Sequence, residues 1–345
     1  MVRSVYVGSA TKDVTQAQVT GINRLKMNVE DKEEIIHCPS RAMETIYAIA
    51  QRVAPTDLSV LITGESGVGK EVIAQQIYRC STRRESPFIK INSAALPDEL
   101  IESELFGYQR GAFTGADTRK IGRIQAAHKG TIFFDEIGEL NPESQTKLLQ
   151  IIQDREFTPL GMNEALQIDI RVLAATNRDL LKAVEEGTFR DDLYHRLNVV
   201  HIRIPPLRER IEDIPVLWDY FTQKYSSEFR RKFDGLLTPE QQALMVTYTW
   251  PGNVRELENF VKNVVLFRDV KAKFADLKRR LENMTLELDD SPSLLDVSKM
   301  VEERVERQVI STVLKQNGWN RKKTAEALQI SYRSLLGKIK KLGIQ

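Results

Sequence analysis

One short stretch, residues 64–71 with the sequence Gly-Glu-Ser-Gly-Val-Gly-Lys-Glu, constrains the fold more than any other part of the chain. An apolar run from Leu58 to Thr63 precedes it, and a helix-like run from Glu71 to Arg79 follows it. A glycine-rich loop between a strand and a helix can turn successive backbone N–H groups toward one point, where the helix N-terminus also favours negative charge. The spacing of the glycines and the lysine is that of a P-loop, which predicts a site for nucleotide phosphates.

Glu71 departs from the general P-loop pattern, which has Ser or Thr at this position to contact Mg²⁺. The metal would then depend on water and on another carboxylate. The alternative interpretation is a glycine-rich loop that binds no ligand, and the lysine argues against it. The residues that we expect to contact nucleotide here are Gly64, Glu65, Ser66, Gly67, Val68, Gly69, Lys70 and Glu71.

Apolar runs alternate with helical patterns through the first two thirds of the chain. After the strand that leads into the P-loop, further strands are expected at residues 87–92, 131–135, 168–177 and 199–204. This alternation predicts an α/β fold, a three-layer sandwich with a parallel sheet between helices. In such a sheet the ligand lies at the carboxyl ends of the strands, so the polar residues that follow the strands are candidates for the site.

Breaks in pattern and composition divide the chain into parts. Prolines at 205 and 206 close the α/β part, because adjacent prolines interrupt both helix and sheet. The expected parts are a short, flexible N-terminal extension (1–34), the α/β nucleotide-binding part (35–206), a small helical lid (207–270), a charged linker with some helical content (271–292) and a compact C-terminal segment (293–345).

Charge and cysteine content indicate the setting in which the protein works. The net charge of the 345 residues is only +2, yet residues 318–345 hold seven basic side chains against one acidic side chain, which favours contact with nucleic acid at that end. Cys38 and Cys80 have neither metal-ligand spacing nor a disulfide framework, and no apolar run is long enough to span a membrane. We expect a cytoplasmic protein without a membrane partner.

Two carboxylates follow the apolar strand at 131–135. Asp135 can hold Mg²⁺ through water, and Glu136 can orient or deprotonate an attacking water. Without a P-loop upstream, such a pair would more often cap a helix. No guanine-reading Asn-Lys-x-Asp motif is present, so ATP is the expected nucleotide.

Hydrolysis also needs positive charge at the transferred phosphoryl group, often from a neighbouring subunit. Arg190 and Arg196 lie in one polar stretch, and Arg255 begins a helix of the lid. From local chemistry alone, each is equally well explained as a surface salt bridge.

Residues 111–116, Gly-Ala-Phe-Thr-Gly-Ala, have the composition of a mobile loop that presents one aromatic and one hydroxyl side chain. Composition alone favours an ordinary turn over a partner-binding tip.

The C-terminal segment has the pattern of three helices. The first, 301–316, is amphipathic; Asn320 can cap a second, to Leu328, and Ser331 can cap a third that Gly343 ends. The last two form a helix-turn-helix candidate whose final helix would enter the major groove. The alternative is a basic helical hairpin that docks on the lid. The residues that we expect at DNA are Arg321, Lys322, Lys323, Ser331, Tyr332, Arg333, Ser334 and Lys338.

Five motifs together resemble the AAA+ activators of sigma-54-dependent transcription, the bacterial enhancer-binding proteins. They are the P-loop at 64–71, Gly-Ala-Phe-Thr-Gly-Ala at 111–116, Phe-Phe-Asp-Glu at 133–136, Pro-Pro-Leu-Arg-Glu-Arg at 205–210 and Trp-Pro-Gly-Asn-Val-Arg-Glu-Leu at 250–257. The resemblance spans residues 35–270, and the C-terminal segment resembles a Fis-type helix-turn-helix. The family's P-loop ordinarily carries Glu where this chain has Glu71.

The resemblance implies an ATPase that binds enhancer-like double-stranded DNA and remodels the closed complex of the sigma-54 RNA polymerase holoenzyme into an open complex. It implies dimers that assemble into a hexameric ring, with ATP and Mg²⁺ as cofactors. The residues that it implies for contact with sigma-54 are Gly111, Ala112, Phe113, Thr114, Gly115 and Ala116.

The resemblance also implies roles for single residues. Asn92 would restrain Glu136 until the γ-phosphate is bound. The roles implied for the other residues are the first sensor for Thr176 and Asn177, the second sensor for Arg255, action in trans across a ring interface for Arg190 and Arg196, and a purine contact for Ile36.

Two positions depart from the family pattern, and two other classes stay open. His37 stands where relatives usually carry glycine, and Gln329 stands where many carry glycine in the helix-turn-helix. The other classes are an AAA+ remodeller of different substrates and a DNA-binding repressor that uses ATP only to assemble. Since no receiver or sensing domain is visible, we expect control by a separate inhibitory protein, by a partner activator or by expression level; alternatively, the chain is a truncated version of a longer product.

Overall fold

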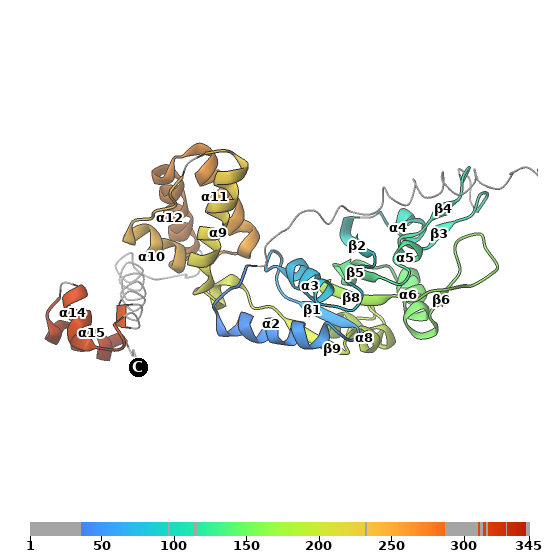
Figure 1. Cartoon of the computed structure of the whole chain (residues 1–345), viewed down its shortest axis with the longest axis horizontal. Helices are drawn as coiled ribbons and strands as arrows, with labels where there is room; N and C mark the ends of the chain where they lie inside the picture. The colour runs from blue at the N-terminus through green and yellow to red at the C-terminus, as the bar shows by residue number, and fades with distance from the viewer. Residues whose placement is uncertain are drawn as a thin grey trace, which may run out of the picture. The chain divides into compact units, whose positions relative to one another are not determined.

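The computed structural model describes residues 36–95, 97–112, 116–231, 233–286, 310, 313–314, 317–328 and 330–342 (Figure 1). Contacts divide the chain into two compact units. The first comprises Met1–His37, Thr45–Gly64 and Gly69–Ile204, and the second comprises Cys38–Glu44, Glu65–Val68 and Pro205–Gln345. The expected N-terminal extension, 1–34, lies outside the described residues.

A five-stranded parallel sheet is the centre of the first unit (Figure 1). Its strand order is β2, β5, β8, β1, β9, and every neighbouring pair is parallel. The bounds are Val60–Thr63 for β1, Phe88–Asn92 for β2, Thr131–Asp135 for β5, Arg171–Thr176 for β8 and Val200–Arg203 for β9. All five predicted strands and the predicted parallel pairing are confirmed.

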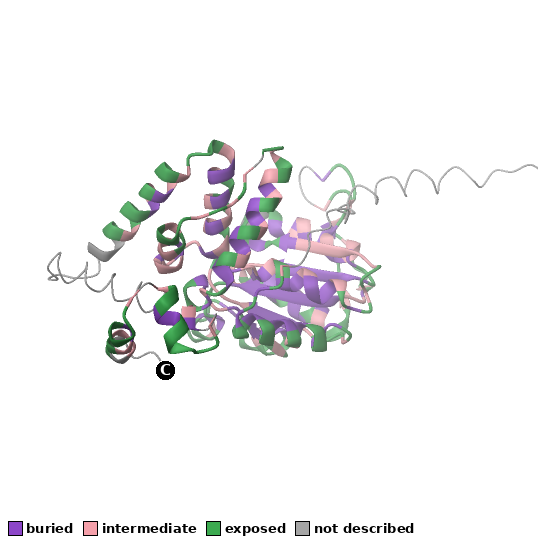
Figure 2. Ribbon diagram, turned by 60° about the vertical axis from the view of Figure 1, so that its left-hand side comes forward, coloured by how far each residue is buried: buried purple, intermediate pink, exposed green. Residues whose placement is uncertain are grey.

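The inner strands are buried on both faces, as their continuous apolar sequences predict. All six residues of β8 are buried, as are the first four of β5. The middle of the sheet appears largely purple in Figure 2. Helix α3 (Lys70–Arg79) packs against β1, β5 and β8, and α8 (Asp191–Leu197) packs against β8. The sheet edge that carries the polar strand ends is therefore anchored in a rigid core.

Shorter elements complete the first unit. The helices are α2 (Arg41–Val53, whose start belongs to the second unit), α4 (Asp98–Phe106), α5 (Arg123–Ala126), α6 (Pro142–Asp154) and α7 (Leu180–Glu185), and the 3-10 turns are η1 (Ser93–Ala95) and η2 (Ile137–Glu139). Two small antiparallel pairs join β3 (Gly107–Tyr108) to β4 (Lys120–Ile121) and β6 (Glu156–Phe157) to β7 (Leu166–Gln167). The loop at 111–116 connects β3 and β4.

The second unit contains the predicted helical lid. Its elements are η3 (Leu207–Glu209), α9 (Asp213–Glu228), α10 (Pro239–Thr247), α11 (Asn253–Phe267) and α12 (Val270–Leu286). Helix α10 begins at a capping box, in which Thr238 and Gln241 each satisfy the backbone N–H of the other. The ring of Phe260 contacts those of the buried Trp218 and Trp250 in this lid.

The linker predicted at 271–292 begins as part of this packed helical region. Helix α12 is continuous to Leu286, and Phe274 and Leu277 on it are buried. The ring of Phe274 lies 5.2 Å from that of Phe260. Phe274 and Leu277 lie on one face of the helix because they are three residues apart. The many charged residues around them made this face hard to recognise in the sequence. Residues 287–292 lie outside the described residues.

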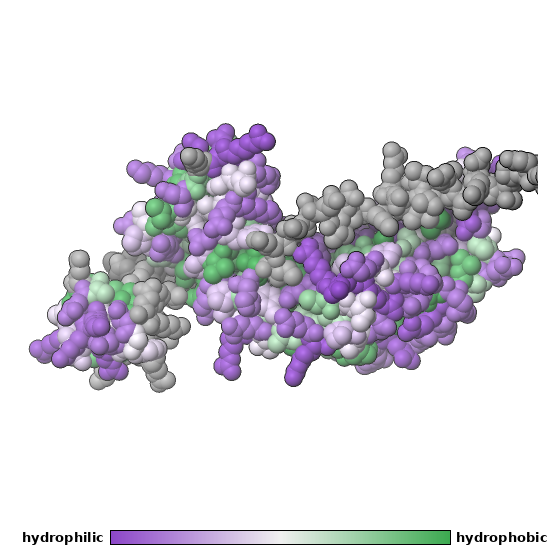
Figure 3. Space-filling model, viewed as in Figure 1, coloured by the Kyte–Doolittle hydropathy of each residue, from purple (hydrophilic) through white to green (hydrophobic). Residues whose placement is uncertain are grey.

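The C-terminal segment has a small core of its own. Helices α14 (Arg321–Ala327) and α15 (Tyr332–Leu342) pack together, and Ala325 and Leu335 on them contact Ile310 and Leu314. The predicted caps are confirmed: Asn320 accepts from Lys323 N at 3.2 Å, and Ser331 accepts from Ser334 N at 3.1 Å. Most of the predicted helix at 301–316, together with Gln329 and Gly343, lies outside the described residues. The face of α14 and α15 seen in Figure 3 is largely hydrophilic.

Across the part of the chain that the structure describes, no helix has the length and the apolar character needed to cross a membrane.

Candidate nucleotide-binding and hydrolytic site

Polar residues end neighbouring strands at one edge of the sheet. The register pairs Asn92 with Asp135 across β2 and β5, and Thr63 with Thr176 across β1 and β8. The N–H of Gly64 donates to the carbonyl of Thr176 over 3.3 Å, so the P-loop begins beside the end of β8. The strand ends that the sequence assigned to the site therefore meet there.

Lys70 is the first residue of α3 and is 7% exposed. Its Nζ donates to the carbonyl of Gly64 at 3.0 Å and lies 3.4 Å from Oε1 of Glu136. Gly67 and Gly69 have φ angles of +78° and +104°, a region that side-chain-bearing residues rarely adopt. The hydrogen bond from Lys70 to Gly64 therefore joins the two ends of the loop, as expected of a loop that surrounds phosphate.

Glu136 has a backbone conformation that is rare for a residue with a side chain. Its φ and ψ are +54° and +53°, a left-handed geometry that costs roughly 1–2 kcal/mol without glycine. The conformation brings Oε2 to 3.0 Å from the N–H of Asn177, while Oε1 faces Lys70. A strained residue held by two partners at the end of a core strand is typical of a functional site.

The side chains of Asn92 and Thr176 each accept a hydrogen bond from a backbone N–H two residues further along the chain. The side-chain oxygen of Asn92 accepts from the N–H of Ala94 at 3.1 Å, and Glu136 is held by Lys70 and Asn177. Restraint of Glu136 by Asn92 thus stays a prediction. Thr176 is fully buried, and its hydroxyl accepts from the N–H of Arg178 at 3.0 Å.

Lys90, which the sequence analysis missed, lies between two carboxylates of the site. Its Nζ is 2.6 Å from Oε2 of Glu71 and 3.8 Å from Oδ2 of Asp135. The alternation of side chains along β2, which places Lys90 on the same face as Asn92, is the signal that could have found it. Burial raises the pKa of the Asp135 carboxyl above its ordinary value, and the ammonium of Lys90 opposes that rise.

The tip of the P-loop and the predicted second sensor both belong to the second unit. Arg255 donates from Nη1 to the hydroxyl of Ser66 at 3.1 Å, and its N–H donates to the carbonyl of Gly67 at 3.3 Å. The structure therefore brings Arg255 onto the phosphate-binding loop, as its predicted role requires.

The two arginines expected to act in trans lie on α8 and just before it. Arg190 forms two hydrogen bonds with Asp192, at 3.0 and 2.7 Å, and Arg196 is exposed in the last turn of the helix. Their action across a subunit interface stays a prediction.

The segment expected near the purine precedes α2. The carbonyl of Ile36 accepts from the hydroxyl of Tyr47 at 3.0 Å, and the ring of His37 lies 5.3 Å from that of Tyr47. The purine contact of Ile36 is therefore untested, although its backbone is anchored.

The loop expected to contact sigma-54 is closed at its base, where the N–H of Gly111 donates to the carbonyl of Ala116 at 2.8 Å. Phe113, Thr114 and Gly115 lie outside the described residues.

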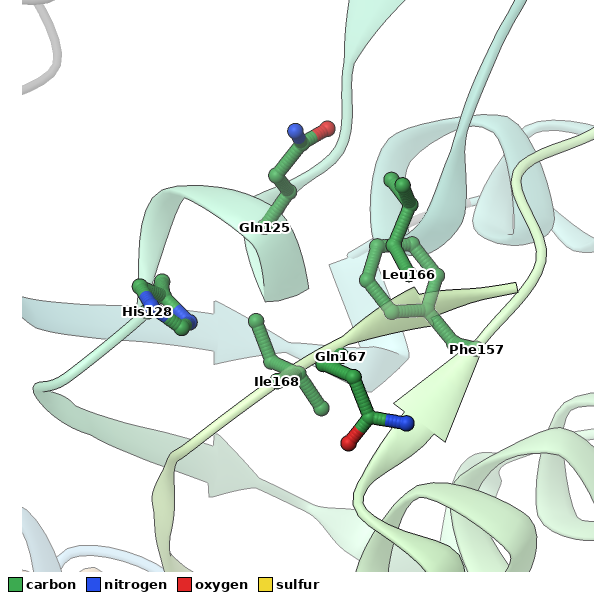
Figure 4. Close-up of a pocket in the computed structure, with 6 residues that line it drawn as sticks. All are labelled: Gln125, His128, Phe157, Leu166, Gln167 and Ile168. Carbon is green, nitrogen blue, oxygen red and sulfur yellow. The ribbon is translucent and has the colours of Figure 1, made fainter. Parts of the chain in front are cut away.

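A hollow of about 350 Å³ elsewhere in the first unit shares no residue with the nucleotide site (Figure 4). Its lining is largely apolar or amide, which does not fit phosphates, and consists of Gln125, His128, Phe157, Leu166, Gln167 and Ile168.

The residues expected at DNA lie near the starts of the last two helices. Arg321, Lys322 and Lys323 form the exposed first turn of α14. The exposed residues at the start of α15 are Ser331, Tyr332, Arg333 and Ser334, and Lys338 follows one turn later.

Comparisons with known proteins place the chain in a family. Three family descriptions match it: "Sigma-54 interaction domain" at residues 36–203, "AAA+ ATPase lid domain" at 208–293 and "Bacterial regulatory protein, Fis family" at 303–342. The regulatory protein AtoC of Escherichia coli K12 is 44% identical over 309 residues, which cover 88% of this chain and 67% of AtoC. The transcriptional regulatory protein ZraR of the same strain is 43% identical over 301 residues, covering 87% and 67%.

A solved structure, NtrX from Brucella abortus in complex with ADP, aligns with a TM-score of 0.69 and 30% identity, covering 95% of this chain and 72% of NtrX. The fold and the site define an AAA+ ATPase. The chain belongs to the sigma-54-dependent transcriptional activators, with a helical lid and a Fis-type helix-turn-helix, and its partners are accordingly sigma-54 and DNA.

Proposed function

We propose that this activator works as a hexameric ring, in which hydrolysis of Mg²⁺-bound ATP moves the loop at 111–116 against sigma-54 and remodels the closed polymerase complex. The observation that carries the proposal is the placement of Glu136 between Lys70 and Asn177 at the edge of the sheet. It joins the phosphate-binding lysine and the predicted first sensor through one carboxylate.

ATP fits the residues of the loop. The positive φ angles at Gly67 and Gly69 let the backbone approach phosphate closely, and Lys70 supplies a buried positive charge. The relative NtrX is described in complex with ADP and with ATP, which supports the same class of ligand for this chain.

Mg²⁺ fits the carboxylates beside the loop. Oxygens of Glu71 and Asp135 both face the ammonium of Lys90, so this position accommodates a cation between them. One or two carboxylates plus phosphate and water are the usual ligands of this ion, whose chemistry is to neutralise charge on the phosphates. Asp135 would hold it through water.

Glu136 would orient and deprotonate the water that attacks the γ-phosphate. Its contact with Asn177 N–H holds the carboxylate in place at the end of β5, and Asn177 would report phosphate loss to the loop through that same bond. A water-positioning carboxylate contributes roughly 10²–10⁴-fold to the rate.

Assembly in a ring would complete the site. Arg190 and Arg196 are exposed just before and on α8, and would reach a neighbouring subunit's phosphate across the ring interface. Arginine supplied in trans neutralises charge in the transition state, which makes hydrolysis depend on assembly.

The start of α15 would read base edges with Arg333 and Ser334, while the basic first turn of α14 would contact DNA phosphates. A regulatory protein is a further expected partner.

The proposal is tested with purified protein, sigma-54 holoenzyme and a sigma-54 promoter, by measuring ATP turnover and open-complex formation together. Wild type should show both activities. Glu136→Gln should lose turnover by at least about 10²-fold while still binding ATP, because the amide cannot accept the proton of water. Glu143→Gln, an exposed change on α6, is the matched control that should keep both.

The loop is tested in the same assay. Thr114→Ala should keep turnover and lose open-complex formation, whereas Thr118→Ala, in the same β3–β4 connection, should keep both. Activation that survives Thr114→Ala would show that another surface contacts sigma-54. Unchanged turnover in Glu136→Gln would remove the assigned base.

A further inference from the structure

The motif at residues 205–210, Pro-Pro-Leu-Arg-Glu-Arg, has no role in the site described so far. Its two arginines contact opposite ends of the P-loop tip. Arg208 forms two hydrogen bonds with the carboxylate of Glu65, at 2.8 and 2.6 Å. Arg210 donates from Nη2 to the carbonyl of Val68 at 2.7 Å and is almost fully buried. Residues 65–68 are thus held at both ends.

The backbone between these ends is held as well. Three consecutive carbonyls each accept a hydrogen bond from the lid side of the second unit: Ser66 from Asn253 Nδ2 at 3.0 Å, Gly67 from Arg255 N–H at 3.3 Å and Val68 from Arg210. The C=O and the N–H of one trans peptide group point in opposite directions. Fixing the carbonyls on one side therefore turns the N–H groups to the other, where phosphate would bind.

Asn253 connects the motif to the loop. It is fully buried with φ at +54°, its Oδ1 accepts from the N–H of Leu207 at 2.8 Å, and its Nδ2 also lies 3.1 Å from Oε2 of Glu65. The loop backbone approaches this turn closely, since a Cβ at Gly67 would lie 2.4 Å from the carbonyl oxygen of Gly252. Only glycine permits that approach.

Arg210 extends the network to the start of α2. Its Nη1 lies 3.5 Å from Oδ2 of the fully buried Asp213, whose carboxylate accepts from the N–H and the hydroxyl of Ser40 at 2.8 and 2.9 Å. The residue just before α2, Ser40, and the tip of the loop expected at the phosphates are therefore connected through the same arginine.

A purely fold-stabilising role explains the exposed part of this network poorly. The side chains of Arg208 and Glu65 are each more than two-fifths exposed, and an exposed ion pair contributes about 0–1 kcal/mol to stability. Two parallel hydrogen bonds between a guanidinium and a carboxylate nevertheless fix geometry well. The pair is suited to setting the conformation of the loop.

We propose that Arg208, Arg210 and Asn253 are positioning residues that hold residues 65–68 in the phosphate-binding conformation. This rests on the proposed nucleotide site. Loss of their hydrogen bonds lets the loop sample other conformations. Only a fraction of the molecules can then bind nucleotide, and the apparent affinity for nucleotide falls by that fraction. The chemical step is unaffected once nucleotide is bound.

The test compares steady-state ATP hydrolysis by the full-length wild type, Arg208→Ala, Arg208→Lys, Glu65→Ala and the double variant Glu65→Ala/Arg208→Ala. Arg208→Ala should raise KM for ATP about tenfold with kcat within about threefold, a coupling of ordinary size for a contacting pair. Arg208→Lys should lie between it and wild type, because lysine cannot reproduce the bidentate geometry. The KM of the double variant should be no higher than that of the single variant with the higher KM.

Arg279→Ala is the matched control, since its guanidinium bonds Asp276 on α12 of the same unit. It should leave KM unchanged. Direct titration with a fluorescent ADP analogue supplies a second reading, in which Arg208→Ala again binds about tenfold more weakly.

A merely structural role would lower the folded fraction, so kcat per total protein would fall while KM stayed constant. That result, an unchanged KM in Arg208→Ala, or additive effects of the two single variants would each overturn the proposal. Failure of the proposed function is distinguishable, because the wild type itself would then show no turnover and no binding of the analogue.

Discussion

The ammonium of Lys70 lies 3.4 Å from a carboxylate oxygen of Glu136, so the residue expected at the phosphates and the residue expected to handle water form an ion pair. Lys70 is buried and Glu136 is one-fifth exposed, which strengthens their interaction relative to a surface pair. A phosphate that drew Lys70 toward itself would weaken this pair and would free Glu136 to bind water. Under the proposed function, nucleotide binding and preparation for hydrolysis would thereby be linked through one side chain.

Lys70→Ala should therefore abolish nucleotide binding, with a loss of at least about 100-fold in affinity from one buried charge-assisted contact. Calorimetric titration with ATP in the presence of Mg²⁺ measures it. Lys182→Ala, which removes an exposed lysine on α7, is the control and should bind as wild type does. Retained binding in Lys70→Ala would mean that phosphate lies elsewhere.

Asp135→Asn should raise the melting temperature at pH 7 in the absence of nucleotide. Burial raises the pKa of Asp135 above its ordinary value of 3.8, and the negative charges of Glu136 and Glu71 act in the same direction. A carboxyl whose pKa is higher in the folded state contributes stability below the ordinary value and loses it as the pH rises through the folded value. At pH 7, well above the ordinary value, this shift therefore lowers the stability of the fold.

Replacing Asp135 by Asn should raise the melting temperature by a few degrees, since about 1 kcal/mol corresponds to roughly 2–4 °C in domains of about 150–250 residues. Thermal unfolding between pH 5 and pH 8 measures it, and the gain should shrink toward the acid end. The exposed change Asp117→Asn should have no such effect. A lower melting temperature for Asp135→Asn would show that attraction to Lys90 outweighs the cost of burial.

Arg333→Ala and Lys322→Ala should weaken DNA binding in different ways. Arg333 lies at the start of α15, where a base contact is expected, so its loss should cost about 1–3 kcal/mol and relax specificity at one position. Loss of Lys322, in the first turn of α14, should weaken binding to all sequences equally and reduce the slope of log affinity against log salt concentration by about one. Titrations of cognate and mutated sites at several salt concentrations separate the two. Identical effects of both changes on specificity would contradict the assigned orientation.

Much of the fold could be predicted from local pattern. The strand at 131–135 was predicted to the residue, because its apolar run is bounded by Gly130 and by the acidic pair that begins at Asp135. The sequence could not order the strands, since the position of β8 between β5 and β1 depends on packing across distant segments. It also missed that α12 packs against the other lid helices, because the buried Phe274 and Leu277 lie in a highly charged stretch.

Residues of the candidate site could be predicted where they belong to short motifs that are continuous in the sequence. Contacts between residues far apart in the sequence could not be predicted. Lys70, Asp135 and Glu136 follow from local spacing. The contact of Glu65 with Arg208 joins residues 143 apart, and nothing in either neighbourhood predicts the other. The left-handed backbone of Glu136 had no signal either, because that conformation usually occurs at glycine or asparagine.

The central claim is that hydrolysis drives the loop at 111–116 against sigma-54. The most direct measurement traps the purified protein with ADP and aluminium fluoride, a mimic of the transferred phosphoryl group, and assays capture of sigma-54 holoenzyme by co-sedimentation. We predict capture by wild type with the mimic, none with ADP alone, and none by Thr114→Ala with the mimic. Capture that is equal in all three samples, or absent from wild type that hydrolyses ATP, would contradict the account.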